Sequence, residues 1–474
     1  NTSHTTPTSQ LSPHPGLTMK SRLLCPCCLL AAGLLLPGYA RAEIKASASS
    51  VHSVPYPAAH AFDGDPNTRW ASRSTTTDEW LQVDFGRSVA LGHVVIHWER
   101  AHPVDYRLEL SDDGTVWRTV HHNPACTGDR EQVPALNGSQ GRYFRVYTTK
   151  YAQWGLASIW DINFVDGEVA AVFEEEQARH RREERARTRA AIERLGRLGV
   201  DEIVFAVRQD AVDEHWYANF GYYAPDVNHK LYRARGRLCK LNVDSGELSI
   251  LVDDPEGTIR DPAVHYDAER VVFSWRRSGT ETFHLYEISI DPSGGSGQVG
   301  TGLRQLTDGI YDDIEPCYLP DGGIVFASAR AKRWVNCWLS PVAVIYRCDA
   351  DGGNIRPLSA NIEHDNTPWV LPDGRVLYQR WEYVDRSQVH YHHLWTMNPD
   401  GTGQMVFFGN MHPGSVFIDA KPIPGSDRVL LIESPGHGRR EHTGHVATVT
   451  DRHGPDETSA LRRVGTNGNC RDPY

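Results

Sequence analysis

Short runs of alternating apolar and polar residues dominate the chain between residues 43 and 168. Alternation with a period of two is typical of strands that bury one face. Asp-Gly and Asn-Gly pairs, which favour turns, separate these runs. Several short strands in one segment of this size predict a β-sandwich. The clearest strands are LQVDF (81–85), HVVIHW (93–98), YRLELS (106–111) and RYFRVYT (142–148).

The pattern changes between residues 169 and 199, where helix-forming residues replace the alternation and no Pro occurs. Glu175–Arg179 and Glu183–Arg187 are spaced as i,i+4 pairs in the favourable order. Apolar positions are sparse. The segment therefore predicts a charged helical linker, solvated along its length and anchored at both ends. A helix that binds a partner is the alternative.

From residue 200 to residue 474 the strand pattern repeats at intervals of just over fifty residues. An acid or amide precedes a Pro in each unit, and an apolar strand follows the Pro. A fixed period with several strands in each unit is typical of a β-propeller. The four marked positions are Asp261-Pro262, Glu315-Pro316, Asn366-Thr367-Pro368 and Asp419-Ala420-Lys421-Pro422.

A fifth unit begins at Asp472-Pro473, and no residue follows Tyr474. We therefore expect a fragment that is truncated within a blade. The predicted fold class is all-β: a β-sandwich, a helical linker and an incomplete propeller with blades of roughly fifty residues.

Composition narrows the function classes. The chain of 474 residues has 49 basic and 60 acidic side chains, a net charge of −11. No basic patch suited to a phosphate backbone is apparent, which argues against nucleic acid as a partner. An apolar content of 40% is too low for a protein with many membrane spans.

Residues 19–42 predict a secretory signal peptide. Lys20 and Arg22 precede an apolar stretch at 23–36 that is too short to span a bilayer, and Ala40-Arg41-Ala42 suits cleavage. A buried core helix is the alternative. We expect export to the periplasm or the extracellular space, no membrane span in the mature chain, and an upstream segment (1–18) whose translation is left open.

Six Cys remain after the signal segment. Export permits disulfides, and six Cys allow 15 pairings among which spacing does not choose. Scattered buried thiols are the alternative. The one C-x-x-C pair, Cys25 to Cys28, is followed by Leu29 in place of His. This stretch therefore has no haem-attachment motif.

Five phrases in the first segment resemble the discoidin family, also called coagulation factor 5/8 type C or galactose-binding-like. The resemblance implies a jelly-roll sandwich that binds glycans, lipid head groups or proteins through loops at one end. The phrases are AFDGDPNTRWAS (61–72), EWLQVDFG (79–86), YRLELSDDGTVW (106–117), GRYFRVY (141–147) and ASIWDINF (157–164).

The resemblance also implies a structural calcium at Asp63, Asp65, Thr68 and Asp161. A hard cation takes several oxygen ligands, and a tight Gly turn brings carboxylates and carbonyls together. The family more often has Glu where this chain has Asp161. An Asx-type turn without a metal is the alternative.

By the same resemblance, the ligand loops are 71–79, 98–105 and 151–157. Arg73, Arg100 and Trp154 are the candidate contacts with a sugar or a cell-surface ligand. An aromatic ring can stack on a sugar face, and a guanidinium can donate to neighbouring hydroxyls. The alternative is solvated surface.

The repeats from residue 200 carry phrases such as LPDGRVLY (371–378) and LWTMNPDGT (394–402) that resemble TolB-like six-bladed propellers. RWVNCWL (333–339) and GNCRDPY (468–474) are similar to proteins related to the hydrazine synthase alpha subunit. That resemblance implies covalent haems outside the propeller, so no catalytic residue is assigned in this chain.

Polar residues before each Pro are expected to line the central channel of the propeller, where they could hold a cation or water. Hydrogen bonding at strand starts is the alternative. These residues are Asp261, Glu315, Asn366 and Asp419. A late group of His residues offers a weaker metal hypothesis; it comprises His364, His390, His392, His393, His412, His437, His442 and His445.

Two functions follow from these patterns. The first is an exported binding protein whose sandwich binds carbohydrate and whose propeller is a scaffold for a protein partner. The alternative is a fragment of a haem enzyme whose redox site lies beyond residue 474. A nucleophile elbow, a P-loop and a dinucleotide fingerprint are absent from the sequence, which favours binding over catalysis for these residues.

Overall fold

The structure is a computed structural model. It describes residues 44–52, 56–64, 68–73, 78–133, 136, 138–152, 155–209, 222–223, 226–230, 234–290, 302–336, 340–383, 386, 391–411, 414–435, 443–465, 468, 470, 471 and 473. The predicted signal peptide and the segment before it lie outside these residues. The chain divides into two compact units, Asn1–Ala186 and Arg187–Tyr474, and each is described by itself.

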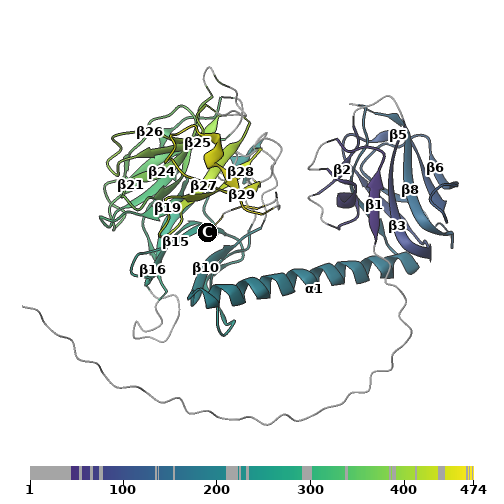
Figure 1. The fold of residues 1–474 in the computed structure, drawn as a ribbon, viewed down its shortest axis with the longest axis horizontal. Coiled ribbons are helices and arrows are strands. Elements are labelled where there is room, and N and C mark those ends of the chain that lie inside the picture. Colours follow the sequence, from purple (N-terminus) through teal and green to yellow (C-terminus); the bar gives the residue numbers. More distant parts are fainter. Residues whose placement is uncertain are drawn as a thin grey trace, which may run out of the picture. The chain divides into compact units, whose positions relative to one another are not determined.

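Two antiparallel sheets form the first unit (Figure 1), which confirms the predicted β-sandwich. A short helix, η1 (Ala58–Ala61), accompanies them. One sheet has the order β1 (Lys45–Ala48), β3 (Glu79–Ala90), β8 (Gln140–Tyr151), β5 (Pro103–Ser111), β6 (Arg118–Asn123). The other has the order β2 (Trp70–Ala71), β9 (Ser158–Phe164), β4 (Val94–Trp98), β7 (Arg130–Val133).

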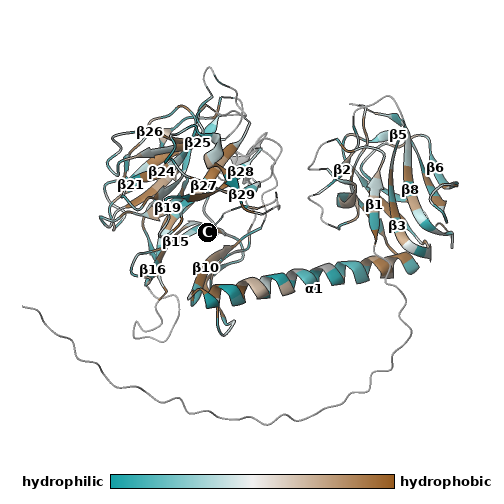
Figure 2. Ribbon diagram, in the orientation of Figure 1, coloured by the Kyte–Doolittle hydropathy of each residue, from teal (hydrophilic) through white to brown (hydrophobic). Residues whose placement is uncertain are grey.

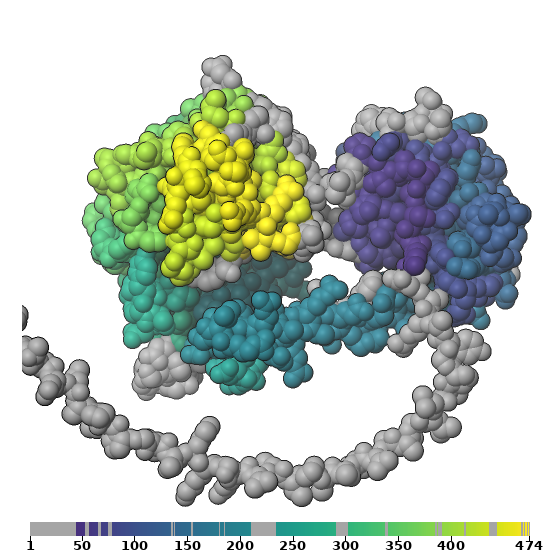
Figure 3. Space-filling model, viewed as in Figure 1, coloured from purple at the N-terminus to yellow at the C-terminus, as the bar shows by residue number. Residues whose placement is uncertain are grey.

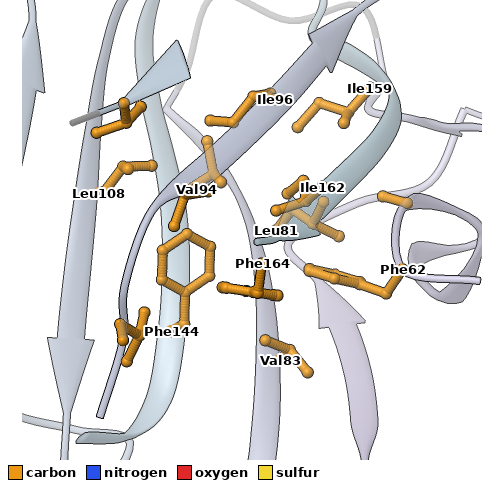
Figure 4. Packing of buried hydrophobic residues seen from close by; sticks show 14 of the residues in the cluster. Phe62, Leu81, Val83, Val94, Ile96, Leu108, Phe144, Ile159, Ile162 and Phe164 are labelled. Carbon is orange, nitrogen blue, oxygen red and sulfur yellow. The ribbon is translucent and has the colours of Figure 1, made fainter. Parts of the chain in front are cut away.

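The core of this unit lies between the two sheets, as Figure 4 shows. The first sheet contributes Leu81 and Val83 of β3 and Phe144 of β8, which are fully buried. Ile96 of β4 and Ile159 of β9 meet them from the other. The residues between these positions face outward, because successive side chains of a strand point to opposite faces.

Helix α1 (Glu168–Arg197) follows the sandwich and confirms that the linker segment is helical. Its first turns join the core of the first unit: Val169 is buried, and the Phe173 ring stacks on Phe164 at 5.1 Å. Further along, Arg179 forms an ion pair with Glu183. Hydrophilic residues occupy much of the helix (Figure 2). Figure 3 shows the same segment in space-filling form.

The second unit is a succession of small antiparallel sheets, as the repeat predicted. The first three-stranded sheet is β10 (Glu202–Val207), β13 (Gly236–Asn242), β14 (Leu248–Asp254), and β11 (Tyr222–Tyr223) pairs with β12 (Asp226–Lys230). Two four-stranded sheets follow: β15 (Thr258–Val264), β16 (Arg270–Arg276), β17 (His284–Ser289), β18 (Arg304–Gln305); and β19 (Asp313–Tyr318), β20 (Ile324–Ser328), β21 (Val344–Cys348), β22 (Arg356–Pro357).

The last two units of the repeat are joined by a parallel pairing of His392 with Val416. Their strands are β23 (Asp365–Val370), β24 (Val376–Trp381), β25 (His392–Met397), β26 (Met405–Phe408); and β27 (Val416–Pro422), β28 (Val429–Ser434), β29 (His445–Val449), β30 (Arg462–Arg463). Short helices η2 (Ala329–Ala331) and η4 (Thr458–Ala460) lie in the connections. The closed ring of a propeller stays a prediction.

A bulge with a left-handed residue interrupts the first strand of each of four successive repeats, which begin with β15, β19, β23 and β27. Side chains other than Gly rarely adopt positive φ, so this conformation marks a position held by its surroundings. The left-handed residues are Asp261, Glu315, Thr367 and Asp419, with φ between 51° and 57°. In the third repeat, which begins with β23, the equivalent position is thus Thr367, one residue after the Asn366 that the sequence pattern marked.

Candidate functional site

The three predicted ligand loops of the sandwich meet at one end, where backbone hydrogen bonds join them. The Ser72 amide donates to the Ala157 carbonyl at 2.8 Å, which links the first loop to the third. The Ser158 amide donates to Ala101 at 2.7 Å, and the Ala152 amide to His102 at 3.1 Å, which link the third loop to the second. The described parts of the loops therefore form one connected surface.

Arg73 and Arg100 are exposed on this surface, so the structure brings two of the three predicted contacts to the same end of the fold. Arg73 lies two residues after β2, and Arg100 two residues after β4. The third predicted contact, Trp154, lies outside the described residues, as do 74–77 and residue 153.

The buried carboxylate of Glu79, which the sequence patterns do not indicate, is linked by hydrogen bonds to the backbone of the first loop. Glu79 is 4% exposed and accepts a hydrogen bond from the Ser50 hydroxyl at 2.7 Å, and Ser49 also donates to this carboxylate. The Ser50 oxygen in turn accepts the amide hydrogen of Arg73 at 3.0 Å. The backbone of Arg73 is thus fixed by a residue far from it in sequence.

The predicted calcium residues are only partly described. Thr68 Oγ1 donates to both carboxylate oxygens of Asp63, at 2.9 and 2.8 Å. Asp161, on β9, is 7% exposed and accepts from Asn163 Nδ2 at 2.6 Å. Asp65 lies outside the described residues. Within the parts of the chain that are described, no group of three His, Cys, Asp or Glu is placed to hold a metal. The calcium site stays a prediction that depends on Asp65.

In the second unit, the strand-start residues link neighbouring sheets. The amide of Glu315 donates to Asp261 Oδ2 at 3.1 Å, and the amide of Thr367 donates to Glu315 Oε2 at 2.6 Å. Each of these carboxylates therefore accepts from the left-handed residue of the next sheet. Arg260 joins the same two carboxylates, at 2.6 Å from Asp261 and 3.2 Å from Glu315.

Burial raises the pKa of Glu315 to about 8, and the negative charges of Asp261 and Asp419 act in the same direction. The Arg260 guanidinium and the Thr367 amide oppose this rise because they favour the ionised carboxylate. The structure thus brings Asp261 and Glu315 together through Arg260, and the negative charge of Asp419 acts on the same Glu315 carboxyl. Asn366 is buried beside this position, and no described residue forms a hydrogen bond with its Oδ1.

The His residues that are described lie among aromatic rings and hydrogen bonds. Trp381 lies against His392 at 5.0 Å and against His364 at 5.7 Å. His364 Nδ1 accepts from the Ala343 amide, and His392 Nδ1 lies 3.1 Å from Gln379 Nε2. His393 lies 5.6 Å from the Phe417 ring, and His445 is on β29. His390, His412, His437 and His442 lie outside the described residues.

Two buried ion pairs also escaped the sequence reading. Asp313 and Asp365 each lie two residues before the left-handed position and are fully buried. Asp313 pairs with Arg330 at 2.7 Å, and Asp365 pairs with Arg380 through two bonds of 2.8 and 2.9 Å. The signal was present, because DIEP and DNTP carry the same acid at the same spacing.

The cysteine residues that the structure describes form no disulfide. Cys126, Cys239, Cys317 and Cys348 are buried free thiols, and Cys337 lies outside the described residues. The alternative of scattered buried thiols therefore holds for these four positions.

Comparison with known proteins identifies the first unit. Residues 44–162 match the family model described as F5/8 type C domain. These residues form a discoidin domain. The match covers the two sheets and the three loops that meet at their end, but it stops before α1.

Solved structures similar to the discoidin domain include a chitosan-binding module of a chitosanase/glucanase from Paenibacillus sp. IK-5. It is 27% identical, with a TM-score of 0.24, and the match covers 26% of this chain and 93% of the module. A family 32 carbohydrate-binding module of Clostridium perfringens NanJ, in complex with galactose, is 21% identical. Its TM-score is 0.24, over 25% of this chain and 91% of the module.

A second similarity is to the hydrazine synthase subunit alpha of Kuenenia stuttgartiensis, 20% identical over 230 residues. This match covers 38% of the chain and 26% of the relative, so the chain spans about a quarter of that protein. The hydrazine synthase structure from the same organism matches 56% of this chain and 38% of its own, at 18% identity and a TM-score of 0.43.

Among the described residues, no helix is long and apolar enough to cross a membrane.

Proposed function

We propose that the chain is an exported binding protein whose discoidin domain binds carbohydrate through loops 71–79, 98–105 and 151–157. The observation that carries this proposal is the meeting of the loops at one end of the sandwich, joined by backbone hydrogen bonds around Arg73 and Arg100. The family match to an F5/8 type C domain supports it.

The geometry suits recognition of a sugar. Backbone bonds between the loops, and the Glu79–Ser50 support beneath Arg73, reduce the conformational entropy that binding would otherwise cost. Arg73 and Arg100 can each donate several hydrogen bonds to sugar oxygens. Trp154 would supply a ring face for stacking against the apolar face of a pyranose.

Binding of the intact chain to a panel of immobilised neutral, acidic and amino sugars tests the proposal. We expect binding to at least one glycan, and loss of that binding in Trp154→Ala. Trp334→Ala is the matched control, because Trp334 is 50% exposed in the second unit and lies outside the loops. If the unmodified chain binds no glycan, or if both variants bind as it does, the proposed site is wrong.

For residues 200–474 we propose a β-propeller that acts as a scaffold for a protein partner. The succession of antiparallel sheets and the hydrogen bonds between their left-handed residues support a rigid array. Affinity capture on the intact chain, with Ile310→Glu as a surface variant, tests it, since Ile310 is 78% exposed. If a captured partner binds the Ile310→Glu variant as it binds the unmodified chain, the partner does not use the surface around Ile310.

The similarity over 230 residues to the hydrazine synthase subunit alpha favours a second function, a haem enzyme whose redox site lies beyond residue 474. The protein isolated from its native source would then show the Soret absorption band of haem and a mass greater than that of residues 1–474. A native protein without that band would contradict this alternative.

A further inference from the structure

The first sheet of the second unit lacks a fourth strand that the following repeats have. In those repeats β18, β22, β26 and β30 each pair with the third strand of their sheet. β14 holds the third position in its own sheet, and among the described residues it pairs with β13 alone. The structure describes residues 234–290 without a gap, so β14 and the turns on both sides of it belong to the described part. The outer edge of β14 therefore has no strand partner within that part.

The backbone groups of Leu248 and Ile250 point toward this open edge. The Asn242 amide donates to the Glu247 carbonyl at 2.9 Å, which makes these two residues a hydrogen-bonded pair at the start of the ladder between β13 and β14. Hydrogen-bonded and non-hydrogen-bonded pairs alternate along an antiparallel ladder. By the register, Leu248 and Ile250 each belong to a non-hydrogen-bonded pair, so their N–H and C=O groups point away from β13.

The side chains of the same two residues are apolar and exposed. Leu248 is 55% exposed and Ile250 is 45% exposed, and they lie on one face because they are two positions apart. The third strand of the next sheet, β17, differs in this respect: its Tyr286 and Ile288 are 4% and 1% exposed. Exposed apolar side chains and outward backbone groups therefore coincide at the beginning of β14.

The outer edges of the later sheets have features that oppose pairing with another chain. β18, β22 and β30 contain two residues each and carry Arg, and β22 also contains Pro357. Short length, charge and Pro are known to block the pairing of edge strands. β14 has seven residues, LSILVDD, without Lys, Arg or Pro. Its register shift lies after Ile250, so the first three residues are regular and can pair.

We propose that the open edge of β14 pairs with the same strand of a second copy of this chain, antiparallel about a two-fold axis at Ser249. This register places Leu248 of each copy opposite Ile250 of the other. The outward N–H and C=O groups of these residues then bond to each other, and the exposed side chains of both copies meet on one face. The antiparallel order also carries Asp253 and Asp254 of the two copies to opposite sides of the axis, so like charges do not face each other.

This self-complementarity is the reason for choosing a second copy over an unrelated strand. A two-fold interface uses the same surface on both subunits, and one strand here supplies matching backbone groups and matching apolar side chains to itself. The inference does not depend on the proposed carbohydrate binding. A dimer would nevertheless present two discoidin domains, and linked sites bind a ligand with repeated units more tightly than one site does.

Sedimentation velocity of the intact chain over a series of concentrations tests the proposal. Ile250→Lys replaces an exposed apolar side chain by a charged one. Leu248→Pro removes an outward N–H at the first residue of the strand, where Pro is tolerated. Val464→Lys is the matched control, because Val464 is 54% exposed and follows β30, the outer strand of another sheet.

We expect a reversible dimer whose dissociation constant rises about tenfold or more in Ile250→Lys and in Leu248→Pro, since each change occurs twice in a symmetric interface. Val464→Lys should dimerise as the unmodified chain does. Under mild oxidation Ser249→Cys should form a disulfide-linked dimer, because residues that face each other across the axis are close enough for that bond. Asp253→Cys lies four positions from the axis and should not form one.

A chain that stays monomeric at every concentration overturns the proposal. Hydrogen exchange in β14 of that monomer would then show whether another segment of the same chain covers the edge or whether the edge is uncovered. A dimer that both β14 variants leave intact, or that Val464→Lys weakens equally, overturns β14 as the interface. Cross-linking of Asp253→Cys without cross-linking of Ser249→Cys overturns the proposed register. None of these results affects the test of glycan binding.

Discussion

Substituting Phe173 by Ala should destabilise the discoidin domain although Phe173 lies beyond the residues matched by the family model. The Phe173 ring stacks on Phe164 at 5.1 Å and on Phe62 at 6.2 Å, and it meets the edge of Phe85 at 6.1 Å. Phe164 and Phe85 belong to the core between the two sheets. The first turns of α1 therefore cover one border of that core.

The expected cost follows from the burial of the ring. A fully buried Phe replaced by Ala loses about 3–5 kcal/mol of unfolding free energy. Phe173 is only half-buried, so we expect about 2 kcal/mol, including the loss of its favourable ring pairs. Leu198→Ala is the control: Leu198 follows the other end of α1, is 77% exposed, and should cost less than about 0.5 kcal/mol.

Hydrogen exchange measured by mass spectrometry on the intact chain separates the two units. Peptides from β3 and β9 should lose protection in Phe173→Ala, whereas peptides from β20 and β24 should exchange as in the unmodified chain. Unchanged exchange in β3 and β9 would refute the reasoning, because α1 would then be an appended linker that contributes nothing to the sandwich.

Three further predictions concern buried or metal-binding acids. Asp365→Asn should lower the unfolding free energy by about 3 kcal/mol because it leaves Arg380 buried without its partner, while Asp373→Asn, in an exposed pair with Arg375, should cost under about 1 kcal/mol in urea unfolding. Burial raises the pKa of Glu363 from 4.5 to about 7, so its protonated form is favoured in the folded state. The unfolding free energy should therefore fall by up to about 3 kcal/mol as the pH rises from 4.5 to 7, and then level off. Glu363→Gln should remove this loss when unfolding by urea is measured at pH 5 and pH 8. The same pH dependence in the variant as in the unmodified chain would contradict the prediction. If the turn at Asp63 and Asp65 holds calcium, excess calcium at about a hundred times its dissociation constant should stabilise the discoidin domain by about 2.7 kcal/mol, and Asp65→Asn should abolish that gain in thermal unfolding.

Patterns local in sequence account for most of the fold that could be predicted. The alternation in LQVDF (81–85) is enough to place Leu81, Val83 and Phe85 in the core, because a strand turns every second side chain to one face. The repeat likewise indicates the order of strands in each four-stranded sheet, since consecutive short strands pair as antiparallel neighbours.

Long-range contacts explain what the sequence reading missed. The Pro spacing marks the repeats in the sequence, but the geometry they share is a left-handed residue whose amide donates a hydrogen bond to the preceding sheet, as Thr367 does to Glu315. The support of Arg73 by Glu79 through Ser50 also joins residues 23 and 29 positions apart. Neither contact leaves a periodic signal in the sequence.

The same contacts bear on where a ligand can bind. Asp261 and Glu315 hold the amides of the next sheets, so a ligand in a central channel would have to break bonds whose loss costs about 1–3 kcal/mol for each buried group. Arg73 and Arg100 carry no such cost, since their guanidinium groups form no ion pair with a described residue and water alone must leave them. The carboxylates of Asp261 and Glu315 stabilise the contacts between sheets, whereas the guanidinium groups of Arg73 and Arg100 form no ion pair with a described residue and can bind a ligand. The discoidin loops are therefore the better place to look for a ligand than the strand starts of the second unit.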